Sequence, residues 1–354
     1  MSELLQLLRR PLRDLRWGVL PVPGRLIAVI FFIFVFIFPL ITSSRSPLHL
    51  LSLAAIFAMF AVSWDLLSGY TGQVNFGHAL FFGAGGYASG LLAHHFGWQP
   101  WLTVPLGAII AALVGTLTSL PALRLRPPYL SLLTMAFPLI LGEIMRSTPR
   151  DIAGGQYGLT LLPKLSSSPV GAYYIVIIIM AVSVLIMWKL TDARSKYIRT
   201  GLIFHAIRED EIAARATGTN TIRYKILAFA IGGFFAGLAG ALHTHIFSAV
   251  GPSIFSMVTS FTVIIYVVFG GIVSIYGSVV GVYTLYPLVE LLRDSPIYEY
   301  RFLIMTALVI LVLLFMPEGI AVWIRDKIER ECPRCKLNNV AWRKECRACS
   351  ADLR

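Results

Sequence analysis

The sequence predicts an all-α protein that crosses a membrane about ten times and keeps both ends in the cytoplasm. Of its 354 residues, 57% are hydrophobic and only 14% are charged, whereas a soluble domain usually carries about a quarter charged residues. The apolar residues also gather in blocks of about 20, the length that a helix needs to cross the hydrocarbon core. The third observation is the uneven distribution of Lys and Arg along the connections between these blocks.

The apolar blocks define the expected membrane domain. The stretches 73–96 and 250–292 are rich in glycine and small polar residues, so re-entry into the membrane is the alternative to crossing there. The chain divides into an N-terminal segment 1–24, a membrane domain 25–320 and a C-terminal linker and tail 321–354. The expected spans are 25–41, 48–68, 73–96, 100–123, 129–146, 171–190, 223–246, 256–273, 274–292 and 300–317.

Positive charge sets the expected orientation. With the N-terminus inside and the sides alternating, the inner side receives 24 of the 30 basic residues: five in 1–25, two in 123–128, eight in 189–225 and nine beyond residue 317. Lys and Arg are enriched in cytoplasmic loops of membrane proteins. The net charge of +12 is therefore better explained by topology than by a nucleic-acid partner.

A glycine-rich stretch, residues 69–87, interrupts the third expected span. Non-helical backbone at membrane depth is tolerated only against protein or a water-filled cavity, and broken helices near the midplane hold substrate in many transporters. A second, shorter glycine-rich interruption at 270–281 predicts a duplicated architecture in which both interruptions line the pathway. Close helix packing is the alternative, because Gly86/Gly90, Gly233/Gly237 and Gly277/Gly281 are spaced four apart. The candidate pathway residues are Gln73, Asn75, His78, Gly85, Gly270 and Gly271.

The long polar loop 191–222 carries a second candidate site. Ile207, Ile212 and nearby alanines predict a short amphipathic helix that stops at Gly218. Glu211 is expected to pair with Arg215 and also with Arg208. Such a helix can rest on anionic lipid, but the acidic cluster at 209–211 favours docking to a protein.

These strings carry a resemblance to a known family. Glu211, Ala213, Ala214 and Gly218 match the Glu-x-Ala-Ala-x-x-x-Gly coupling motif of ABC importer permeases. The wider strings SGYTGQVNFGHALFFGAGGYASGLL, AIREDEIAARATGTN and the Gly-Gly-x5-Gly run at 270–277 closely resemble permease subunits of branched-chain amino-acid ABC transporters, of the leucine/isoleucine/valine type. The resemblance covers roughly residues 45–320. Urea permeases are the related alternative.

The resemblance implies partners and a role. A second permease subunit would complete the pathway, two ATPase subunits would dock on the coupling segment, residues 206–218, through Arg208 and the motif residues, and an extracytoplasmic binding protein would deliver substrate. The chain lacks a G-x-x-x-x-G-K-S/T phosphate loop and so is expected not to bind or hydrolyse ATP itself. The implied location is the cytoplasmic (inner) membrane of a bacterium or archaeon.

The tail carries all four cysteines, in two CxxC pairs. Four thiolates at this spacing suit tetrahedral zinc, and a reducing cytoplasm keeps them available. The tail is expected to be a zinc ribbon; two redox-active disulfides or an iron site are the alternatives. The expected ligands are Cys332, Cys335, Cys346 and Cys349.

Two other functional classes compete with an ABC permease. An ion-coupled secondary transporter would need no ATPase and would have no use for the coupling segment. A membrane sensor would use the zinc ribbon as its output module. Among the intramembrane ionisable residues, Asp65 is a functional candidate by default. Glu143 and Arg146 are expected to form a helix-end pair, and His245 to lie at the membrane interface.

Overall fold

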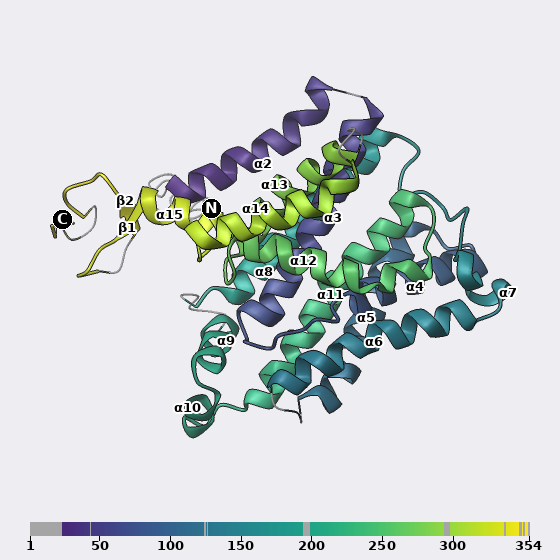
Figure 1. Ribbon diagram of the computed structural model, residues 1–354, viewed down its shortest axis with the longest axis horizontal. Helices are drawn as coiled ribbons and strands as arrows, with labels where there is room; N and C mark the ends of the chain where they lie inside the picture. Colours follow the sequence, from purple (N-terminus) through teal and green to yellow (C-terminus); the bar gives the residue numbers. More distant parts are fainter. Residues whose placement is uncertain are drawn as a thin grey trace, which may run out of the picture.

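The computed structural model describes residues 23–42, 44–123, 125, 127–193, 199–293, 298–335, 338–346, 349 and 351–352. Most of the N-terminal segment 1–24, part of the loop 191–222 and parts of the tail lie outside these residues. Helices make up most of the described chain, and one two-stranded antiparallel sheet lies in the tail (Figure 1). The elements are α2 (Pro23–Ile41), α3 (Arg45–Trp64), the π-helical turn η2 (Asp65–Gly69), α4 (Ala79–Phe96), α5 (Pro100–Ala122), α6 (Pro127–Ser147), α7 (Arg150–Ala153), η3 (Gly155–Tyr157), α8 (Pro169–Thr191), α9 (Thr200–Glu209), α10 (Glu211–Ala216), α11 (Thr221–Phe247), η4 (Pro252–Phe255), α12 (Met257–Gly270), α13 (Ile275–Arg293), η5 (Tyr298–Tyr300), α14 (Arg301–Phe315), α15 (Ile320–Ile328), β1 (Glu329–Glu331) and β2 (Asn338–Val340).

Each of the ten expected spans coincides with a helix. Among the described residues, seven helices are long and apolar enough to cross a membrane, and two shorter apolar ones cover Val29–Leu40 and Met257–Gly270. Helix α4 is not among the seven. Of the two stretches for which re-entry was the alternative, 73–96 holds a helix that starts late, at Ala79, and 250–292 combines the short helix α12 with α13, which is long enough to cross.

The unwound segment, residues 70–78, separates η2 from α4. Helix α3 enters it through a π-helical turn, a feature often found at functional sites. Gly72 adopts a positive φ of 69°, which glycine accepts without steric cost. The segment is anchored by side chains on α3 and η2: the Trp64 indole donates to the Asn75 carbonyl (2.6 Å), and the Ser68 hydroxyl accepts from the Asn75 backbone N–H (3.1 Å).

Helix α3 forms the centre of the bundle, with 83% of its apolar window buried. Helices α8, α11 and α13 pack beside it, and α4, α5 and α11 pack closely on one another. Gly85 of α4 lies directly against the backbone of Gly237 in α11, so that a side chain at residue 85 would collide with that backbone. Ala111 and Gly107 of α5 close the same contact. Small residues allow this approach, and the packing interpretation of the spaced glycines is confirmed.

Helices α12 and α13 are joined by a sharp, non-helical link at 271–274. Gly271 has a φ of 124° and Val273 a φ of 62°, a conformation that a β-branched residue rarely adopts. Gly270 packs against the backbone of Gly277, which brings the end of α12 onto the start of α13. Helix α15 covers this link, because Gly319 and Val322 both contact Gly271.

One end of the bundle therefore gathers several elements (Figure 1). Helix α15 contacts α2, α12 and α13, and α9 contacts α8 and α11. At the other end lie α7, η3 and η4, beyond the last residue of α11. At about 1.5 Å per residue, the 27 residues of α11 separate the two ends by about 40 Å.

Candidate functional site

The coupling segment folds as two short helices, where one continuous helix was expected. The break lies at Asp210, whose backbone is extended (φ −156°, ψ 107°). Its side chain accepts hydrogen bonds from the N–H groups of Ile212 (2.8 Å) and Ala213 (3.0 Å). This is an N-cap, which satisfies donors at the start of a helix. Asp210 therefore ends α9 and starts α10, and the chain turns away at Gly218 (φ 84°) as expected.

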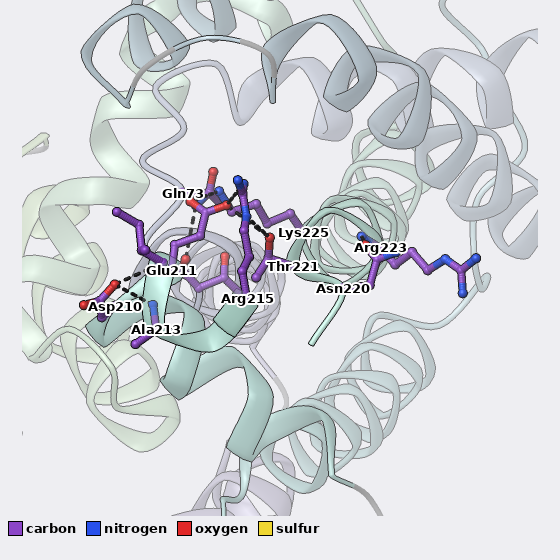
Figure 2. A network of polar contacts seen from close by, with 11 residues as sticks. Gln73, Asp210, Glu211, Ala213, Arg215, Asn220, Thr221, Arg223 and Lys225 are labelled. Carbon is purple, nitrogen blue, oxygen red and sulfur yellow. Dashed lines mark hydrogen bonds and ion pairs between the residues drawn. The ribbon is translucent and has the colours of Figure 1, made fainter. Parts of the chain in front are cut away.

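Glu211 holds α10 onto the start of α11. One carboxylate oxygen accepts from the Lys225 ammonium (2.6 Å), and the other from Arg215 (2.5 Å) and from the Thr221 hydroxyl (3.2 Å). Figure 2 shows these four side chains converging, while Arg223 points away. The expected Glu211–Arg215 pair is confirmed. The expected pair with Arg208 is wrong, because the break at Asp210 places Arg208 on the other helix.

This network favours the charged form of Glu211. Partial burial opposes ionisation, but the hydrogen bonds and charges of Lys225 and Arg215 outweigh it and lower the pKa of Glu211. The Lys225 side chain is only 9% exposed, and among the described residues Glu211 is the carboxylate that compensates its ammonium. Lys225 is a functional candidate that the sequence did not single out. The sequence feature that could have identified it is the presence of a lysine one turn inside an apolar span.

The coupling segment touches the unwound segment directly. Gly72 faces the backbone and side chain of Arg208. The Cα and Cγ atoms of Arg208 lie 3.6 Å from the position that a Cβ atom on residue 72 would take. On the same helix α9, the ring of His205, which directly precedes the coupling segment, meets the Tyr70 ring edge to face, with centroids 5.3 Å apart. Helix α9 therefore packs on residues 70–72 without an intervening element.

Two of the polar side chains proposed for the pathway are bonded within the protein. His78 is fully buried; its ring nitrogens lie 2.9 Å from the Ser63 hydroxyl and 3.2 Å from the Asn75 amide nitrogen, and its ring stacks on Phe60. The side-chain amide oxygen of Asn75 (Oδ1) accepts from the Gly77 N–H (2.9 Å). These bonds fix the shape of the unwound segment.

The other pathway candidates differ in their surroundings. Gln73 is half-buried and donates to the Thr71 carbonyl (3.3 Å), which leaves it the least constrained of the polar three. Gly85 and Gly270 lie in helix contacts, and Gly271 lies in the α12–α13 link under α15. The role of these six residues in a pathway stays a prediction.

Asp65 connects two distant parts of the chain. It is fully buried, and its carboxyl oxygens accept from the N–H groups of Val273 (2.8 Å) and Ser274 (3.0 Å) and from the Ser278 hydroxyl (3.3 Å). The side chain thus caps the start of α13 from η2. Sequence alone marked Asp65 as unusual, but the partners more than 200 residues away gave no local signal.

His245 is not interfacial, contrary to expectation. It is 1% exposed, and its Nε2 atom lies 2.9 Å from the Ser89 hydroxyl and 3.0 Å from the Thr103 hydroxyl. Its Nδ1 atom lies 2.7 Å from the Pro163 carbonyl oxygen. The imidazole therefore ties α4, α5 and α11 to the loop before α8. Buried polar groups need such partners, which only the folded chain supplies.

The four tail cysteines form one cluster. All four sulfurs lie within 4.8 Å of one another, with 3.6 Å between Cys332 and Cys349 and 3.4 Å between Cys335 and Cys346. A tetrahedron with Zn–S bonds of about 2.3 Å has edges of roughly 3.8 Å. Backbone N–H groups of the Cys335 knuckle lower the pKa of the Cys332 thiol, which favours the thiolate that a metal needs. The cluster can hold a metal ion.

Comparison with known proteins identifies the family. The family model for the permease component of branched-chain amino acid transport systems matches residues 46–314. The high-affinity branched-chain amino acid transport system permease protein LivM of Salmonella typhimurium is 28% identical over 83% of this chain and 74% of its own. LivH of the same organism is 28% identical over 76% and 92%, and the probable LivM of Methanocaldococcus jannaschii is 23% identical over 75% and 90%.

No solved structure matches the chain significantly. The matched proteins are permease components of transport systems and not enzymes. The seven apolar helices agree with a protein that passes through the membrane several times. By its sequence match and its helical architecture, the chain belongs to the family of permease components of branched-chain amino acid transport systems.

Proposed function

We propose that this chain is one membrane subunit of an ABC importer that carries branched-chain amino acids inward. The observation that carries the proposal is the contact between the coupling segment and the unwound segment. An exposed two-helix element, fixed to α11 through Glu211 and Lys225, packs directly on residues 70–72. This is the arrangement that a subunit driven by a separate motor requires, and an ion-coupled transporter has no use for it.

The energy source lies outside this chain. Two ATPase subunits dock on α9 and α10, and Ile212, which is 80% exposed, supplies an apolar anchor at the tip. Closure of the ATPases moves the coupling segment as a rigid body. The motion reaches the unwound segment through Arg208 and His205, and Asp65 passes it to the α12–α13 link. A second permease subunit completes the pathway, and an extracytoplasmic binding protein delivers the substrate.

The orientation follows from charge. The coupling segment, α15 and the cysteine tail occupy one end of the bundle, and the basic residues concentrate in the same parts of the sequence. We assign this end to the cytoplasm and the end with α7, η3 and η4 to the outer side of a bacterial or archaeal inner membrane. ATPase docking and reduced thiols both require this orientation.

The cysteine cluster holds a structural zinc ion. Cys332, Cys335, Cys346 and Cys349 supply four thiolates at nearly tetrahedral spacing, and the β1–β2 hairpin holds the first pair. The Asn339 amide reaches the Cys346 sulfur at 3.6 Å, a contact of the kind that orients metal ligands. With zinc bound, the tail is a folded ribbon carried on α15.

Reconstituted transport tests the proposal. The chain is purified with its second permease and ATPases and placed in liposomes with the binding protein outside. We expect ATP-dependent uptake of radiolabelled leucine. Uptake driven by a proton or sodium gradient without ATP would establish the secondary-transporter alternative, and uptake of urea but not leucine would replace the substrate.

A further inference from the structure

The end of the bundle opposite the coupling segment contains a cavity of about 610 Å³. This volume lies in the range of about 300–1,000 Å³ that is typical of small-molecule sites. Three separate segments line the cavity: the last turns of α6, the turn η3, and Gly251 with the first two residues of η4. Its lining residues are Glu143, Arg146, Ser147, Gln156, Tyr157, Gly251, Pro252 and Ser253.

The walls of the cavity are held in place before any ligand arrives. Leu159 and Val250 exchange both backbone hydrogen bonds (2.8 and 2.9 Å), which joins the η3 side to the η4 side. Gly158, with a φ of 73°, lies against the Val250 carbonyl with no room for a side chain. The Arg150 guanidinium covers the Tyr157 ring at 4.4 Å. A preformed wall reduces the ordering that a ligand must impose.

The charged groups of the cavity form a complementary pair. Glu143 and Arg146 are one helical turn apart on α6, and their charged atoms lie 3.5 Å from each other. Both side chains are more than half exposed, at 69% and 53%, so their mutual attraction is weak. The pair can open to admit a ligand that brings one charge of each sign, and Gln156 and Ser253 add neutral hydrogen-bonding groups.

The floor of the cavity leads toward the interior of the bundle. Two residues beyond Ser253, the Phe255 side chain is buried between Gly83 of α4 and Gly142 of α6, and it stacks on Tyr87 with ring centroids 5.5 Å apart. The segment that lines the cavity therefore also packs into the interior of the bundle through Phe255.

We propose that this cavity is an entry site for a free α-amino acid. The guanidinium of Arg146 takes the carboxylate of the amino acid, and the carboxylate of Glu143 takes its ammonium. The Tyr157 ring and Pro252 face the side chain of the ligand. The proposal rests on the proposed function, and it adds a place where the zwitterion is received before Phe255 moves aside.

The test measures weak binding directly. The full transporter complex is placed in nanodiscs without the binding protein, and saturation-transfer NMR follows three probes: leucine, leucinamide, which lacks the carboxylate, and 4-methylpentanoate, which lacks the ammonium. We expect Arg146→Gln to raise the apparent Kd for leucine about tenfold, which corresponds to about 1.4 kcal/mol, without changing that for leucinamide. We expect Glu143→Gln to raise the apparent Kd for leucine by the same factor without changing the apparent Kd for 4-methylpentanoate.

Matched controls and two opposing outcomes complete the test. Lys164→Ala and Asp151→Asn remove exposed charges outside the cavity lining and should leave leucine binding unchanged. Equal leucine binding in wild type and both cavity variants would overturn the entry site, even where the wild type imports leucine with ATP. Weaker association of the loaded binding protein, with leucine binding intact, would instead make the cavity a protein contact. A wild type that imports no leucine would overturn the proposed function itself.

Discussion

Removal of the Glu211 carboxylate should detach α10 from α11. In Glu211→Ala, Lys225 keeps its buried position but loses its carboxylate partner. An exposed ion pair contributes up to about 1 kcal/mol, whereas removing one partner of a buried pair costs about 3–5 kcal/mol. The Lys225 side chain is 9% exposed and the Glu211 side chain 31%, so we expect about 2 kcal/mol. That is a roughly 30-fold shift toward a detached α10.

The assay follows both structure and coupling. Hydrogen exchange of the α10 amides in the reconstituted complex should accelerate about 30-fold, and the amount of leucine imported per ATP hydrolysed should fall. Arg223→Ala is the matched control, because Arg223 is exposed and points away from the network. Membrane insertion should be unaffected in both variants.

A second substitution tests the cause of the defect. In Glu211→Ala/Lys225→Met the buried position carries no charge, so the penalty of the uncompensated ammonium disappears. We expect the double variant to recover part of the protection of α10 and part of the coupling. A double variant as defective as Glu211→Ala would refute the argument, since the loss would then not come from the buried Lys225.

The remaining predictions concern the backbone, the buried acid and the metal. Gly218→Ala should cost about 1 kcal/mol in thermal-unfolding assays, because a Cβ atom disfavours the positive φ of this residue. Gly218→Asn should cost less, because an Asn side chain can hydrogen-bond locally in this conformation and open space surrounds the residue; equal losses would contradict this. Asp65→Asn should lower the free energy of unfolding by about 1.5–3 kcal/mol, since the amide turns an N–H group toward the Val273 or Ser274 N–H, and an unchanged Tm would refute the cap. The purified chain should contain one zinc ion, and Cys332→Ser should release it; equal zinc content in both would exclude the cluster as its site. Acidification should preserve the Glu211–Lys225 contact until the pH falls below the ordinary glutamate pKa, and weaken it as the pH passes through the lowered pKa of Glu211; hydrogen exchange of the α10 amides at each pH measures this.

The sequence determined the broad architecture of this protein. Blocks of apolar residues of bilayer length required helices at the ten expected places, because backbone groups in lipid must be bonded within one segment. The glycine-rich strings were long enough to specify the family. The CxxC spacing determined a four-sulfur cluster, because each pair forms a local knuckle and only the approach of the two knuckles needed the fold.

The tertiary structure decided what each polar residue contacts. Sequence presented Asp65 as a buried acid, but its partners at 273–278 are set by how α3 meets the α12–α13 link. Local pattern also suggested an Arg208–Glu211 pair, whereas the Asp210 cap and the buried Lys225 redirected Glu211 to α11. His245 was placed at the interface by its position near a span end, and the fold surrounded it with hydroxyls. Hydrophobic length is a property of one segment and can be read along the chain. Partners of buried polar groups come from other segments, and only the packed bundle brings them together.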